Sequence, residues 1–320
     1  MERIKVGNIE INNFVLGAGR LGDINYKNEC FNILDRYLDL CYNTLDVARS
    51  YADGQCEEFL GEYLKNRRKD VIIMSKGGFP KSRSEMYKTR LSLNDLEEDI
   101  NKSLSALKTD HVDIYFLHRD DVSKPPEELI ESLNVLIREG KTLEIGASNW
   151  TAGRIEQANN YALKNGLKPF TVSQINYSYA LTTPALTGDI THIVMNDVEY
   201  MWYKETQFPI IAYSVQAKGF FTKYFTKEEL KPSGKLSYLP LRENFLRAER
   251  IKKLSENKNI PIPALLLSYV LSKDINSAVL GGFSSVCQLD ESLLGIETRL
   301  NEYELEFLDS GNDKENIYGS

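Results

Sequence analysis

Short apolar runs alternate with amphipathic stretches along almost the whole chain. Continuous apolar runs of this length, bounded by turn residues, are typical of parallel strands that are buried on both faces. We therefore expect eight such strands, at residues 14–18, 42–47, 71–75, 113–117, 143–147, 170–174, 209–214 and 277–281.

The stretches between these runs carry apolar residues at the three-to-four-residue spacing of helices. We expect helices at residues 29–40, 57–65, 93–107, 126–139, 151–165, 196–206 and 243–256. Ser92 or Asn94 can cap the third helix and Thr151 the fifth, while Gly140 and Gly166 follow the last turns of two helices.

Alternation of strands and helices predicts an α/β protein with a parallel sheet, and eight units predict closure into a (β/α)8 TIM barrel. Residues 6–11 predict an N-terminal β-hairpin, and residues 261–271 and 301–308 predict extra C-terminal helices. No linker interrupts the pattern. We therefore expect one barrel domain at residues 1–310, followed by a polar tail at residues 311–320.

Composition and charge exclude several classes of partner. The hydrophobic fraction of 42% and the charged fraction of 27% are typical of globular proteins. A net charge of −7 without a basic stripe argues against nucleic acid. The N-terminus has no signal-peptide apolar region, and no apolar run is long enough for a membrane span, so we expect a cytoplasmic protein with no membrane partner. The oligomeric state stays open.

The chain has four cysteines, Cys30, Cys41, Cys56 and Cys287, which lack the spacing of a metal site. We expect reduced thiols, as in a cytosolic protein, and no metal.

Ionisable residues follow three neighbouring predicted strands. Asp46 and Tyr51 follow the second strand, Lys76 the third and His118 the fourth. Because the strands of a barrel all end at one face, these four groups are expected to meet there. A carboxylate, a phenol, an ammonium and an imidazole in one patch can form a proton-transfer site.

A competing motif lies near the N-terminus. Residues 17–22 match G-x-G-x-x-G, and Asp46 ends the next strand, as in a doubly wound dehydrogenase in which it would bind the ribose. That motif requires a helix to begin at the third glycine, whereas helical periodicity begins only near Glu29. The pattern thus favours a glycine-containing loop at the barrel mouth, with the dehydrogenase as an alternative.

Further segments give the chain a resemblance to the aldo-keto reductases, particularly the bacterial members. It runs from about Val15 to Ser292 and rests on residues 46–51, 74–76, 116–119, 146–150, 172–174, 212–214 and 282–292. The resemblance implies NAD(P)H-dependent reduction of a small aldehyde or ketone to an alcohol.

The resemblance also implies a role for each ionisable group. Tyr51 is the general acid that protonates the carbonyl oxygen. The Lys76 ammonium is expected to lower the pKa of Tyr51 from its usual value near ~10. Asp46 pairs with Lys76, and His118 donates a hydrogen bond to the substrate oxygen.

For the cofactor, the resemblance assigns Ser148, Asn149 and Gln174 to the nicotinamide carboxamide, and Tyr213 to stacking on its ring. Amide groups before the last helix are expected near the adenosine phosphate. The implied cofactor-binding residues are Ser148, Asn149, Gln174, Tyr213, Ser214, Gln216, Gly282, Ser284 and Gln288.

Two departures from the family pattern concern this cofactor. Where the family usually has Ser-Pro-Leu, this chain has Ser214-Val215-Gln216. Ser284 stands in place of an arginine found in some members, and Ser292 in place of an asparagine. Lys218 or Lys223 is the candidate substitute for the arginine. The family implies NADP(H) more than NAD(H).

Loops at the barrel mouth set the choice of substrate. The residues expected to line the substrate site are residues 119–121, residues 177–179 and Trp150. The acids at 120 and 121 suit a hydroxylated or cationic substrate, and the alternative is that they lie on a solvated loop. We predict a carbonyl reductase. The alternative is a regulatory or redox-sensing barrel that binds the cofactor without significant turnover, which the intact set of four groups disfavours.

Overall fold

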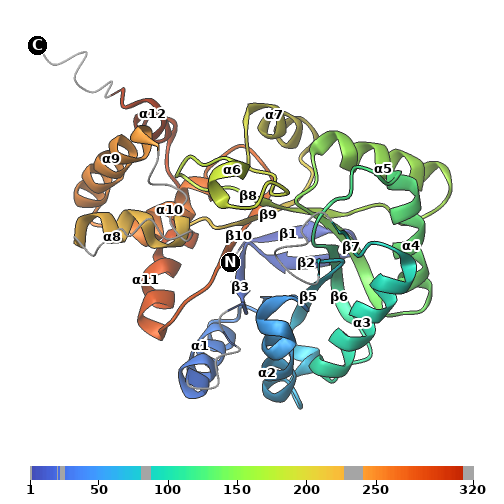
Figure 1. The fold of residues 1–320 in the computed structure, drawn as a ribbon. Coiled ribbons are helices and arrows are strands. Elements are labelled where there is room, and N and C mark those ends of the chain that lie inside the picture. The colour runs from blue at the N-terminus through green and yellow to red at the C-terminus, as the bar shows by residue number, and fades with distance from the viewer. Residues whose placement is uncertain (1, 20, 22–25, 81–87, 227–240, 313–320) are drawn as a thin grey trace, which may run out of the picture.

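Eight parallel strands close into a barrel in the order β10-β3-β4-β5-β6-β7-β8-β9 (Figure 1). The structure, a computed structural model, describes residues 2–19, 21, 26–80, 88–226 and 241–312. The strands are β3 (Phe14–Gly17), β4 (Thr44–Asp46), β5 (Ile72–Gly77), β6 (Val112–Leu117), β7 (Thr142–Ser148), β8 (Val172–Asn176), β9 (Ile210–Tyr213) and β10 (Ser277–Gly281). The predicted TIM barrel is confirmed, and its closure excludes the doubly wound alternative.

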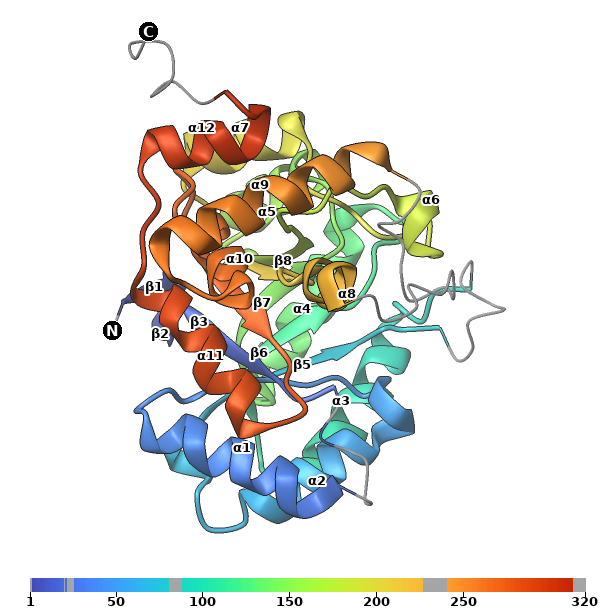
Figure 2. The same ribbon diagram turned by 90° about the vertical axis from the view of Figure 1, so that its left-hand side faces the viewer.

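Helices surround the barrel, and all but the last of those named next lie where the pattern predicts one (Figures 1 and 2). They are α1 (Lys27–Asp39), α2 (Gln55–Tyr63), α3 (Leu93–Leu107), α4 (Pro126–Arg138), α5 (Ala152–Lys164), α7 (Asp197–Thr206), α10 (Ile262–Leu271) and α11 (Val286–Glu297). Ser92 caps α3 by accepting from the Asp95 amide at 3.2 Å, and Thr151 caps α5. Gly140 and Gly166 follow α4 and α5 with φ values of +71° and +65°.

The N-terminal hairpin closes one end of the barrel. Strands β1 (Arg3–Val6) and β2 (Ile9–Asn12) pair antiparallel, as expected. Ile4, Val6 and Ile11 pack against apolar side chains of the barrel interior. The Asn8 amide in the hairpin turn donates to the Glu144 carboxylate near the start of β7, at 2.9 Å. The hairpin therefore covers the ends where the strands begin, and the opposite face is left for a site.

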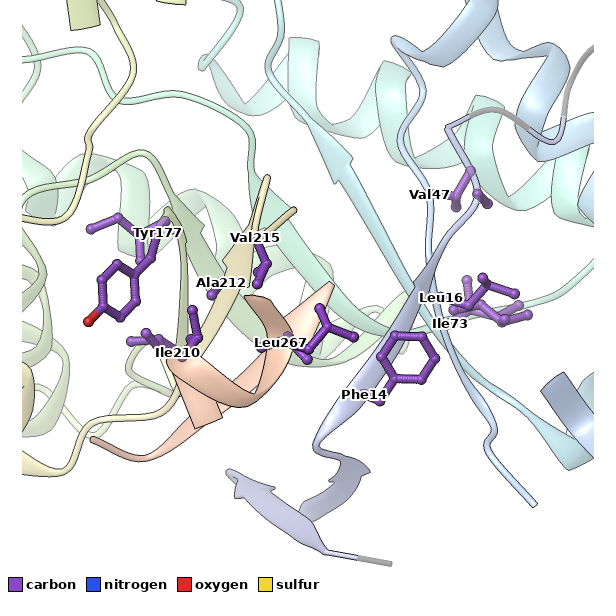
Figure 3. Close-up of a cluster of buried hydrophobic side chains, with 14 of the residues drawn as sticks. Phe14, Leu16, Val47, Ile73, Tyr177, Ile210, Ala212, Val215 and Leu267 are labelled. Carbon is purple, nitrogen blue, oxygen red and sulfur yellow. The ribbon is translucent and has the colours of Figure 1, made fainter. Parts of the chain in front are cut away.

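Strand periodicity decides which side chains enter the barrel. One set of residues faces the helices and packs beneath them; Figure 3 shows part of it, including Phe14 and Leu16 of β3 and Ile210 and Ala212 of β9. The alternate set fills the interior with Val15, Met74, Ile114, Phe116, Val172, Ile211 and Ala278. At the ends of strands β4 to β9, this inward set continues into polar residues, which places them in the barrel mouth.

Additional helices accompany the barrel. They are α9 (Arg242–Lys258) and α12 (Glu302–Ser310), which were expected, and α6 (Pro184–Thr187) and α8 (Phe220–Thr226), which were not. Helices α8, α9 and α12 lie together on one side of the barrel (Figure 1). An Asn301 capping box begins α12, and Lys258 pairs with Glu304 at 2.5 Å to join α9 and α12. Of the expected tail at 311–320, residues 313–320 lie outside the described residues.

Candidate active site

The ammonium of Lys76 is the centre of a buried polar cluster at the barrel mouth. Lys76 Nζ lies 2.7 Å from both carboxylate oxygens of Asp46, 3.2 Å from Tyr51 Oη and 3.0 Å from the Val47 carbonyl. Lys76 and Asp46 are each 1% exposed. Strands β4 and β5 pair directly, so inward positions at their ends bring these residues together. A buried ion pair with a phenol at its edge results.

His118 completes the group of four residues predicted from the sequence. Its ring centroid lies 5.9 Å from that of Tyr51 with an interplanar angle of 77°. Ser50 Oγ lies 3.3 Å from His118 Nδ1, and the Phe79 ring packs against the imidazole at 4.9 Å. The predicted convergence of Asp46, Tyr51, Lys76 and His118 on one patch is therefore present.

The protonation of Tyr51 differs from the sequence-based expectation. Burial raises the pKa of Tyr51 above its usual value, and the neighbouring Lys76 lowers it by less than burial raises it. The expected lowering is thus wrong for the protein alone, although Lys76 acts in the expected direction. Tyr51 consequently holds its proton at neutral pH.

The charges around Tyr51 are fixed by the same competition. Burial opposes the Lys76 ammonium, but Asp46 and Tyr51 outweigh it, and the pKa of Lys76 is raised. Burial, followed by the positive charges of Arg119 and Lys76, holds the pKa of His118 well below its usual range. At neutral pH the site therefore combines a neutral phenol, an ammonium and a neutral imidazole.

The residues expected to hold the carboxamide form a connected network beside this cluster. Gln174 Nε2 donates to Asp46 Oδ1 at 2.8 Å. Asn149, in the left-handed region at φ +59°, donates to Ser148 Oγ at 3.1 Å and accepts from Tyr213 Oη at 2.6 Å. The structure thus brings all four residues to the mouth. Their role toward a nicotinamide stays a prediction.

A cavity of about 560 Å³ opens beside β10 and the start of α11. Five of the expected cofactor-binding residues line it: Ser214, Gln216, Gly282, Ser284 and Gln288. Ser285 caps α11 by accepting from the Gln288 amide, so the helix begins beside this cavity. Gln216 Nε2 donates to Ser292 Oγ at 2.8 Å, so two of the departures from the family pattern contact each other. The cavity's size and the hydroxyl, amide and lysine side chains among its apolar lining residues fit a nucleotide.

The expected substrate-lining residues are mostly elsewhere. Trp150 and Tyr179 are fully buried and Tyr177 is 9% exposed, and all three pack in the layer beneath the helices. Asp120 makes two hydrogen bonds of 2.8 Å to Arg154. The three aromatic residues were therefore wrongly expected to line the mouth, and Asp120 is satisfied by an ion pair.

Several residues at the mouth were not found from the sequence. Ser50 and Phe79 contact His118, and His192 packs edge-on against Tyr213 at 6.1 Å. Asn176, two residues after Gln174 on the inward face of β8, is 3% exposed, and its Oδ1 has no hydrogen-bond partner among the described residues. Because side chains alternate along a strand, Asn176 shares the face of Gln174, and this alternation could have identified it from the sequence.

Two other properties follow from the described residues. No described helix is long and apolar enough to cross a membrane. Within the described ranges, no group of three or more His, Cys, Asp or Glu side chains could hold a metal ion.

The active sites of barrel enzymes lie at the carboxyl ends of the strands, and the polar cluster of this closed barrel lies at that face. The fold and the cluster together are those of a barrel enzyme. The sequence model of the aldo/keto reductase family matches residues 13–313. The chain therefore belongs to the aldo/keto reductase family, and it is an oxidoreductase.

Individual relatives agree with this assignment. An aryl-alcohol dehydrogenase of Pestalotiopsis microspora is 32% identical over 277 residues, which cover 82% of this chain and 67% of the relative. An uncharacterized oxidoreductase of Bacillus subtilis is 27% identical, over 99% of this chain and 98% of its own. A thermostable aldo-keto reductase solved with the inhibitor epalrestat shares the fold, with a TM-score of 0.74 at 22% identity, covering 98% of this chain and 100% of that one. These names do not favour the regulatory alternative.

Proposed function

We propose that this protein reduces an aldehyde or ketone to an alcohol with NAD(P)H, and that Tyr51 is the general acid. The observation that carries the proposal is the position of Lys76, whose ammonium lies 3.2 Å from the phenol oxygen and 2.7 Å from the Asp46 carboxylate inside the barrel. A phenol beside a buried ammonium can release its proton during a reaction, because the resulting phenolate is stabilised by the positive charge.

Each residue has a distinct part in this reaction. The bound nicotinamide supplies the hydride that reduces the carbonyl carbon. Tyr51 donates its proton to the carbonyl oxygen, and Lys76 stabilises the phenolate that forms. Asp46 holds the ammonium in place through both of its carboxylate oxygens. His118, neutral and beside the phenol, hydrogen-bonds the substrate oxygen and fixes its direction.

The cofactor is proposed to extend from the mouth into the cavity beside α11. Ser148, Asn149 and Gln174 hold the carboxamide, Tyr213 supports the ring, and the cavity takes the pyrophosphate and adenosine. Lys218 and Lys223 both line that cavity, and Glu291 is the one acid among its described lining residues. Two ammonium groups against one carboxylate favour the additional phosphate of NADP(H) over NAD(H).

Aromatic aldehydes are the first substrate class to test. The name of the Pestalotiopsis relative, an aryl-alcohol dehydrogenase, points to this class. In the structure, the rings of Tyr51, Phe79 and His118 lie together at the mouth, where an aryl group can pack edge-on or offset against them.

The test follows nicotinamide absorbance with purified protein, NADPH and a panel of aryl and alkyl aldehydes and ketones. Tyr51→Phe should lower kcat by at least about 10²-fold while it retains cofactor binding. Tyr303→Phe is the matched control, because this tyrosine is 69% exposed on α12. Equal turnover in wild type and Tyr51→Phe would contradict the mechanism, and cofactor binding without turnover on any carbonyl would contradict the function.

A further inference from the structure

The residue after His118 is a buried arginine whose guanidinium reaches four acceptors. Arg119 is 6% exposed. Its Nη1 donates to the His118 carbonyl at 2.7 Å, its Nε to Thr191 Oγ1 at 2.9 Å, and its Nη2 to Asp189 Oδ2 and His192 Nε2, each at 2.9 Å. A buried guanidinium requires such partners, and Asp189 neutralises its charge. The acceptors come from two separate segments of the chain.

These contacts fix the state of His192. Arginine can only donate hydrogen bonds, so His192 Nε2 must accept from Arg119. The proton is therefore on Nδ1, which lies 2.8 Å from Thr187 Oγ1 and donates to it. Burial, and then the charge of Arg119, lowers the pKa of His192 to about 4, which agrees with a neutral ring.

Residues 187–193, which we call the wall segment, lie against the groups proposed to hold the nicotinamide. The Ile193 amide donates to Asn149 Oδ1 at 3.3 Å, the same oxygen that accepts from Tyr213. The His192 ring packs on the edge of Tyr213 at 6.1 Å and 62°. Arg119 thus holds a segment that supports both residues.

Arg119 also supports His118 from two directions. It binds the main-chain carbonyl of His118, and its guanidinium lies 5.2 Å from the centroid of Phe79. Phe79 in turn packs on the His118 imidazole at 4.9 Å. Arg119 therefore contacts both the backbone of His118 and the ring that packs on its imidazole.

We propose that Arg119 is a positioning residue that links His118 to the wall segment, so that the substrate-orienting imidazole and the nicotinamide-supporting residues keep a fixed relative geometry. The inference rests on the proposed function for the meaning of that geometry. Lysine cannot replace Arg119, because one ammonium group cannot reach four acceptors spread around a planar guanidinium.

The test compares Arg119→Met and Arg119→Lys with Arg154→Lys. Arg154 is the matched control, since it makes a similar paired contact with Asp120 but does not touch His118 or the wall segment in the contacts of the described residues. Nitrogen NMR reports the tautomer of His192, and the chain has only three histidines to assign. Steady-state kinetics with NADPH and an aryl aldehyde report kcat and KM.

We expect the Nδ1–H tautomer of His192 in the wild type and in Arg154→Lys, and its loss in Arg119→Met. The kcat of Arg119→Met should fall by about 10²-fold with a change of less than about threefold in the KM of the aldehyde, and Arg119→Lys should recover only part of it. Arg119→Lys also serves if Arg119→Met does not fold.

Arg119→Met with the His192 tautomer of the Arg154 control overturns the proposal, and so does either Arg119 variant with the kcat of that control. Failure of the proposed function gives a different result. In that case the wild type turns over no carbonyl, while the tautomer still changes only when Arg119 is replaced, which supports the link between Arg119 and the wall segment.

Discussion

Replacing Lys76 with methionine should cost stability as well as activity. Lys76→Met keeps the length of the side chain but removes the ammonium that contacts both oxygens of Asp46 at 2.7 Å. The Asp46 carboxylate, 1% exposed, would keep Gln174 as a donor but would lose its only neighbouring positive charge in the described site. A buried charge without its counter-ion strongly disfavours the folded state.

The size of the effect follows from that burial. Removing one partner of a buried ion pair costs about 3–5 kcal/mol of unfolding free energy. For a chain of 320 residues, this corresponds to a decrease in Tm of about 4–8 °C. Adding Asp46→Asn to Lys76→Met removes the uncompensated charge, so the double variant should regain most of the stability.

Activity should behave differently from stability. Neither variant has an ammonium beside Tyr51, so both should lack turnover, even though the double variant folds nearly as stably as the wild type. Thermal and urea unfolding of the four proteins of this double-mutant cycle measure the coupling, and nicotinamide absorbance measures turnover. A double variant no more stable than Lys76→Met, or a single variant as stable as the wild type, would refute the reasoning.

Three further predictions concern other parts of the molecule. His192 binds a proton near pH 6.5 when unfolded but near pH 4 when folded, so the free energy of unfolding decreases as the pH falls through this window. His192→Gln should reduce that decrease by up to about 3 kcal/mol, as measured by urea unfolding. Gly295→Ala places a methyl group 1.9 Å from the Ala264 carbonyl oxygen, so it should lower the free energy of unfolding by about 1–3 kcal/mol and weaken cofactor binding. Gly153→Ala meets no atom within 4 Å and should be neutral or stabilising when both variants are compared in thermal melts. Lys218→Ala with Lys223→Ala should weaken NADPH binding about tenfold or more in a fluorescence titration, while NADH binding changes by less than about twofold; equal losses for both cofactors would contradict the phosphate assignment.

The sequence was most informative where local pattern and tertiary structure agree. Apolar runs gave the barrel strands because parallel strands covered on both faces need continuous apolar side chains. The ends of those runs located Asp46, Lys76 and His118, since all strands of a barrel end at one face. Short elements such as α6 and α8 were missed because four to seven residues carry little periodicity.

Errors arose where the direction of a side chain, rather than its place along the chain, decides its role. Tyr177 follows strand β8 but lies an odd number of positions from Gln174, so it faces the helices, whereas Asn176 faces the mouth. The pKa of Tyr51 was misjudged because the sequence shows neighbouring charges but not burial. Three of the four acceptors of Arg119 lie about 70 residues away and become visible only in the fold.

Transfer of a labelled hydride tests the central claim most directly. The protein is incubated with an aryl aldehyde and NADPH that carries deuterium at the transferable position of the nicotinamide, and mass spectrometry locates the label. The account predicts one deuterium on the carbinol carbon of the alcohol in the wild-type protein, and almost no product with Tyr51→Phe. An alcohol without deuterium, or no alcohol from any carbonyl although the cofactor binds, would contradict it.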